Sequence, residues 1–68
     1  MNKIKIDTEI IKLDAFLKWA SIASSGSEAK IYVQDRMIKV NGEVCTQRGK
    51  KLRIGDVVNF EGSDFEII

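Results

Sequence analysis

A stripe of hydrophobic residues early in the chain predicts a short amphipathic helix. The stripe follows the spacing i, i+3, i+4 and i+7, so it covers about 100° of arc on a helix surface. Asp14 lies in the predicted first turn, where a negative charge suits the helix dipole. Ahead of this helix, polar and apolar residues alternate over 3–6, which predicts a strand that can continue through 8–12. The stripe consists of Leu13, Phe16, Leu17 and Ala20.

A capping box predicts where a second helix begins. Ser25 and Glu28 are three positions apart, so we expect the helix to start at Gly26 and to end near Asp35 or Arg36. The two faces of this helix differ in polarity. Its apolar face consists of Ala29, Tyr32 and Val33, and a polar stripe about 120° away consists of Ser27, Lys30 and Gln34.

The second half of the chain reads as short strands separated by turns. Residues 38–40 alternate in polarity, and the Asn41-Gly42 pair that follows favours a type I′ hairpin, because both turn positions need a positive φ. A strand over 57–60 and a turn over 62–64 predict a second hairpin. The chain holds fifteen Ile and Val residues against three Leu, which also favours sheet.

These elements predict one α+β domain over residues 1–68. Two short helices pack on a small, mainly antiparallel sheet, with an additional N-terminal strand and a C-terminal hairpin. Hydrophobic residues make up 44% of the chain, as in an ordinary globular protein, and no repeat or linker interrupts it.

Four motifs follow one another along residues 12–60. They are Lys12-Leu13-Asp14, Ser25 to Ala29, Ile38 to Gly42, and Gly55 to Val58. This series resembles the RNA-binding domain named after small-subunit ribosomal protein S-four, whose motifs read approximately R-L-D, S-x-x-x-A, V-x-V-N-G and G-D-x-V. The resemblance implies the S-four-type (α-L) fold. It also implies binding to structured RNA, with ribosomal RNA or ribosomal particles as the expected partners.

Two segments narrow the resemblance to the stand-alone YaaA-type branch of small bacterial proteins. S-G-S-E-A-K at 25–30 and R-G-K-K-L at 48–52 are similar to that branch's S-G-G-x-A-K and R-G-x-K-L. The chain departs from the family pattern at three positions, with Lys12 in place of Arg and Ser27 in place of Gly. Arg36 stands where a Gly usually ends the second helix, and a left-handed Arg36 costs about 1 kcal/mol relative to Gly.

Charge is distributed unevenly along a chain whose net charge is only +1. Residues 12–53 hold nine basic and four acidic side chains, whereas residues 54–68 hold four acidic side chains and no basic one. No acid lies between Glu43 and Asp56, so no neighbour in the sequence neutralises the cations around Gly49. A basic middle and an acidic tail predict a polarised surface.

The basic segments carry the candidate RNA contacts. Phosphates are bound by cations and free backbone N–H groups, and the helix start at 25–27 offers such groups, although the Glu28 carboxylate competes for them. We expect a phosphate backbone to dock electrostatically between this helix start and the basic loop at 48–53. The predicted contacts are Ser25, Gly26, Ser27, Lys30, Gln34, Arg48, Lys50, Lys51 and Arg53, and Lys12 joins them by its motif position.

Alternative interpretations stay open at this point. Ser25 can serve only as a helix cap, and exposed lysines are commonly just solvated. Trp19 lies about 110° from the centre of the first helix's stripe, so it either covers the edge of the core or stacks on a base. A different function is a protein-interaction module that uses an exposed sheet edge or the acidic C-terminal hairpin.

Several classes of function are disfavoured by composition. The chain has no histidine and one cysteine, Cys45, and it has no phosphate-binding loop or nucleophile motif, so we expect no enzyme, metal, cofactor or small-molecule substrate. No apolar run approaches the roughly 18 residues of a membrane helix, so no membrane association is expected. A single unpaired thiol fits the reducing cytoplasm.

Overall fold

Nine short elements make up the computed structural model, which describes residues 1–68. They are β1 (Asn2–Ile4), β2 (Ile10–Lys12), α1 (Leu13–Trp19), α2 (Gly26–Gln34), β3 (Ile38–Val40), β4 (Glu43–Val44), β5 (Lys51–Arg53), β6 (Val57–Phe60) and β7 (Ser63–Ile67).

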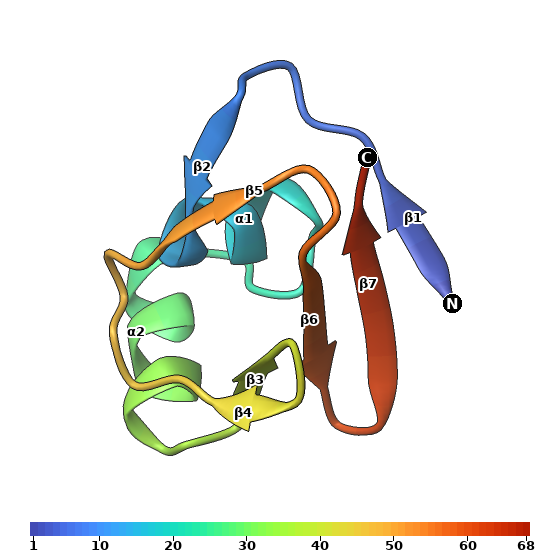
Figure 1. Ribbon diagram of the computed structural model, residues 1–68. Coiled ribbons are helices and arrows are strands. Elements are labelled where there is room, and N and C mark those ends of the chain that lie inside the picture. Colours follow the sequence, from blue (N-terminus) through green and yellow to red (C-terminus); the bar gives the residue numbers. More distant parts are fainter.

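The strands form two separate sheets, as Figure 1 shows. The larger sheet has the order β1-β7-β6-β3-β4, and every pair in it is antiparallel except β1 with β7. Strands β2 and β5 form a two-stranded antiparallel sheet of their own. Both helices lie on one side of the larger sheet (Figure 1). The predicted α+β class, with two helices on a mainly antiparallel sheet, is confirmed.

One apolar core joins the helices to both sheets. All thirteen buried side chains are apolar, and no polar or charged side chain is buried. The predicted stripe of α1 supplies Leu13, Phe16 and Leu17, and α2 supplies Ala29 and Val33. From the strands, the fully buried side chains are Ile38, Leu52, Val58 and Ile67.

The ends of α2 follow the sequence prediction closely. The Ser25 hydroxyl accepts a hydrogen bond from the Glu28 backbone N–H at 3.1 Å, as a helix cap does. The helix stops at Gln34, and Arg36 takes the left-handed conformation with a φ of 61°. That position favours glycine, so the arginine carries the predicted strain of about 1 kcal/mol.

The β3–β4 connection is the predicted type I′ turn. Asn41 and Gly42 have φ values of 51° and 89°, and the Asn41 side chain holds the turn. Its carbonyl oxygen accepts from the Val57 backbone N–H at 2.9 Å, and its amide donates to Asp56 at 3.1 Å. Asn41 therefore ties this hairpin to the start of β6.

Two predicted strand boundaries are wrong. The N-terminal strand is not continuous: the polar residues 7–9 bend the chain, so β1 and β2 join different sheets. The last hairpin turns at Glu61 and Gly62, both with positive φ, rather than over 62–64. A two-residue turn of this type leaves Ser63 free to begin β7.

Two side chains mark where strands end. Cys45 is buried and follows β4. Ile54 is exposed, although Leu52 is buried, because β5 ends at Arg53 and the chain turns there.

Candidate nucleic-acid interface

Strands β2 and β5 place three cations on one outer face. Lys12 lies directly opposite Lys51, and Arg53 lies opposite Ile10. Residues opposite each other in an antiparallel pair project to the same side. Since Leu52 between them is fully buried, the inner face of this pair covers the core. The exposed side chains of Lys12, Lys51 and Arg53 therefore share the solvent face, which we call the basic ribbon.

The register of this pair creates a like-charge contact. Lys12 and Lys51 are exposed cross-strand neighbours, and like charges at such positions repel. None of the twelve side-chain hydrogen bonds in the structure uses a lysine or arginine head group. An anion bound between the two ammonium groups would remove this repulsion. The repulsion itself does not stabilise the fold.

Backbone hydrogen bonds fix the loop before β5 to the start of α1. The Leu13 backbone N–H donates to the Lys50 carbonyl at 2.9 Å, and the Asp14 backbone N–H donates to the Arg48 carbonyl at 3.1 Å. These bonds satisfy N–H groups that a helix start leaves free. They also hold Arg48 and Lys50 beside the basic ribbon with exposed side chains.

The start of α2 is a second exposed polar surface. Ser25, Gly26, Ser27 and Lys30 are all exposed, and the backbone N–H groups of Gly26 and Ser27 donate to no acceptor in the protein. Gln34 is exposed one turn beyond Lys30 on the same helix. This arrangement is the one that binds anions at helix starts.

The Glu28 carboxylate modifies that surface in an unforeseen way. It accepts hydrogen bonds from the Ser24 backbone N–H at 3.0 Å and from the Ser24 hydroxyl at 3.2 Å, instead of from Ser25 as in a standard capping box. The Ser24 backbone N–H is the largest cause that lowers the pKa of Glu28, and the Tyr32 hydroxyl adds to it. The carboxylate is therefore charged at neutral pH and makes the start of α2 less attractive to phosphate than the basic ribbon.

The predicted contacts fall into two groups. Backbone pairing brings Arg48, Lys50, Lys51 and Arg53 together with Lys12, although they lie far apart in the sequence. The α2 residues form the other group. In Figure 1 the loop that leaves β4 passes α2 before it reaches β5.

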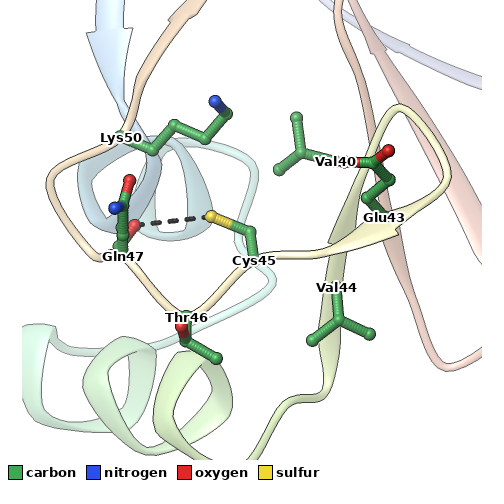
Figure 2. A pocket seen from close by; sticks show the side chains of 7 residues that line it. All are labelled: Val40, Glu43, Val44, Cys45, Thr46, Gln47 and Lys50. Carbon is green, nitrogen blue, oxygen red and sulfur yellow. Dashed lines mark hydrogen bonds between the residues drawn. The ribbon is translucent and has the colours of Figure 1, made fainter.

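A small pocket lies under this loop, as Figure 2 shows. Its volume is about 260 Å³, and the Cys45 thiol in it contacts the Gln47 carbonyl at 3.7 Å. Lys50 lines the same pocket, so one cation of the loop reaches toward a partly polar hollow (Figure 2). Sequence patterns did not indicate this pocket, because Glu43 and Gln47 meet Lys50 only through the path of the loop.

The fold does not require glycine at two positions of the interface. A methyl group added at Gly26 or Gly49 would meet nothing within 4 Å, and neither residue needs a positive φ. Glycine at these positions lets a ligand approach the backbone more closely than a larger residue would.

Trp19 satisfies neither interpretation fully. Its side chain is 51% exposed, and its indole N–H donates to the Lys5 carbonyl at 2.8 Å. The residue is therefore tied to the N-terminal segment by this bond and still presents much of its side chain to solvent.

Other kinds of site are not built by the structure. No group of three or more His, Cys, Asp or Glu side chains is placed to hold a metal ion. None of its helices has the length and apolarity needed to cross a bilayer.

An exposed ribbon of cations on a small α+β scaffold is a feature found in nucleic-acid-binding domains as a class. The sequence matches the family model described as S4 domain over residues 4–68. The chain therefore belongs to the S4 domain family, the family of RNA-binding domains that its motifs predicted.

Two relatives support this assignment. The chain is 44% identical to "Probable ribosome maturation protein RlbA" of Bacillus subtilis (strain 168), an alignment that covers 98% of this chain and 96% of the relative. It is 31% identical to "Putative RNA-binding protein YbcJ" of Escherichia coli (strain K12), with 85% of this chain and 83% of the relative covered.

Proposed function

We propose that this protein binds structured ribosomal RNA without catalysis and acts in ribosome maturation in the cytoplasm. The observation that carries the proposal is the basic ribbon, in which Lys12 and Lys51 face each other across two strands. The name of the Bacillus subtilis relative supports the link to ribosome maturation.

The mechanism is electrostatic docking of a phosphate backbone. The backbone lies across the basic ribbon and the 48–50 loop, and it continues to the free N–H groups at the start of α2. A-form RNA has a major groove too narrow for side chains, so shape and phosphate positions decide the fit more than base identity. If about five phosphates are engaged, log K against log salt has a slope of roughly −3.5 to −4.5.

Part of the acidic charge lies away from the basic ribbon in this chain of net charge +1. Glu61 and Asp64 lie at the β6–β7 turn, which Figure 1 places at the opposite end of the molecule from β2 and β5. Asp56 lies closer to the ribbon, but its carboxylate accepts from the Arg53 backbone N–H at 2.8 Å and from Asn41. Asp7 and Glu9 precede β2 at its Ile10 end and not at its Lys12 end.

Titration of ribosomal RNA fragments at low and physiological salt tests the proposal, with duplex DNA as the control ligand. We expect RNA-preferring binding that Lys50→Glu/Lys51→Glu abolishes and Lys30→Glu weakens. Lys3→Glu/Lys39→Glu is the matched control, because it makes the same change in charge at exposed positions on β1 and β3, outside the interface. Equal losses in both double variants, or binding that none of the variants changes, would contradict the assigned face.

Strand addition at a sheet edge is a weaker candidate function. The outer strands of the larger sheet are β1 with three residues and β4 with two. Very short edge strands are a common protection against pairing with another chain. No observation therefore favours a protein-interaction module over RNA binding.

A further inference from the structure

A second, apolar pocket lies between β2 and α1. It is an open hollow of about 370 Å³, lined by Ile11, Ala15, Lys18 and Trp19. Three of these four residues are hydrophobic, and the fourth carries a positive charge. Ala15, the smallest of the four, lies four residues before Trp19 in α1 and therefore on the same side of the helix.

The exposure of Trp19 has no explanation in the fold. A half-exposed tryptophan often keeps its N–H in contact with water, but here the indole N–H already donates to the Lys5 carbonyl. That bond fixes the orientation of the ring. The result is a rigid aromatic surface beside a cation. Its apolar area stays exposed to water unless a bound group covers it.

The pocket adjoins the basic ribbon along the free edge of β2. Ile11 lines the pocket and Lys12, the next residue, belongs to the ribbon, so the two sites occupy opposite faces of one strand. Strand β2 pairs only with β5, which leaves its other edge unpaired. Asp7 and Glu9 precede β2, so a phosphate backbone meets less repulsion at the Lys12 end.

We propose that this pocket binds one unpaired nucleobase of the RNA, stacked on Trp19, with Lys18 beside the phosphate of the same nucleotide. Base stacking on an aromatic side chain tolerates any base, because every base has a flat π surface. The inference rests on the proposed function and refines it: the target is a helix with a bulge or a loop nucleotide next to it, and not a uniform duplex.

Fluorescence of the single tryptophan tests the pocket directly. The full chain is titrated with an RNA hairpin that carries a one-nucleotide bulge and with a fully paired hairpin of the same stem. We expect both hairpins to bind, the bulged one about tenfold more tightly, and only the bulged one to quench the indole emission. Equal affinities with no difference in quenching would overturn the pocket but leave the proposed function intact, whereas no binding of either hairpin would overturn both.

Two variants separate stacking from a structural role. Trp19→Phe keeps the aromatic face but loses the N–H that Lys5 accepts, and Trp19→Leu keeps only apolar bulk. With fluorescently labelled RNA we expect the phenylalanine variant to keep the preference for the bulge and the leucine variant to lose it, while both bind the paired hairpin as before. Loss of the preference in both variants would overturn stacking and assign the effect to the Lys5 contact.

A second copy of the chain is the competing occupant. Quenching that rises with protein concentration in the absence of RNA, together with a doubled mass in sedimentation, would overturn the proposal and assign the pocket to self-association.

Discussion

The cations of the basic ribbon and the acids of residues 54–68 use charge in different ways. Asp56 and Asp64 both accept hydrogen bonds within the protein, from the Arg53 backbone N–H and from the Asn59 side chain respectively. The cations of the ribbon have no such partners, and two of them face each other. The acids therefore help to hold turns and strands in place, whereas the bases remain available to a ligand. The acidic and the basic parts of the sequence thus have two separate physical roles, the first in holding the fold and the second in binding a ligand.

Truncation of Leu52, the buried residue between two cations of the ribbon, is expected to have the largest effect on stability. Leu52 is fully buried, so Leu52→Ala should lower the free energy of unfolding by about 2–4 kcal/mol. A domain of this size has a total stability of only about 3–5 kcal/mol. Urea denaturation measures the change. The control is Ile54→Ala, two residues further on but 62% exposed, for which we expect little loss; equal losses would mean that the ribbon does not pack as described.

Loss of the Asp56 carboxylate should reduce stability without reducing RNA affinity. Asp56→Ala removes the acceptor for the Arg53 N–H and for the Asn41 amide, so the free energy of unfolding should fall by about 1–2 kcal/mol. Glu66→Ala is the control, since that carboxylate has no hydrogen-bond partner. If Asp56→Ala weakened RNA binding while the fold persisted, the separation of roles between acids and bases would be wrong.

Neutralising one lysine of the facing pair should raise stability and lower RNA affinity. Lys51→Gln removes the repulsion with Lys12, so stability should rise by about 0.2–1 kcal/mol. RNA affinity should fall, and the salt slope should decrease in magnitude by roughly 1. Urea denaturation and RNA titration on one preparation give both values. Lys39→Gln is the control, because Lys39 faces Val44 and Asn59 rather than a charge, and the same gain in stability there would discount the repulsion.

The smallest effect concerns pH. The hydrogen bonds from Ser24 hold the pKa of Glu28 below its ordinary value of 4.5, so its contribution to stability is complete above that value. As pH falls below 4.5 and then through the lowered pKa of the folded state, this contribution is lost. Thermal unfolding across this range should show a smaller decrease for Glu28→Gln than for the natural chain. Parallel curves would show that the carboxylate does not support the start of α2.

Local patterns predicted the helices and the turn at Asn41-Gly42, because each depends on residues within one or two turns. Such local patterns could not predict which strand pairs with β2. Strand β5 lies some forty residues further along the chain, and only tertiary packing of Leu52 selects that register. The candidate cations were therefore identified individually, but the Lys12–Lys51 contact was not. The bond from Trp19 to Lys5 was missed for the same reason, since a backbone carbonyl gives no sequence signal.

Pairing between the two ends of the chain has a consequence for folding during synthesis. Strand β1 pairs with β7 alone, and the Ile6 backbone N–H donates to the carbonyl of Ile68. Strand β1 thus has no partner in the sheet until β7 has been synthesised. Contacts so distant in sequence are closed late and slowly. Because buried Ile67 belongs to the same core as Leu52, the core beneath the cationic surface needs residues from both ends of this domain.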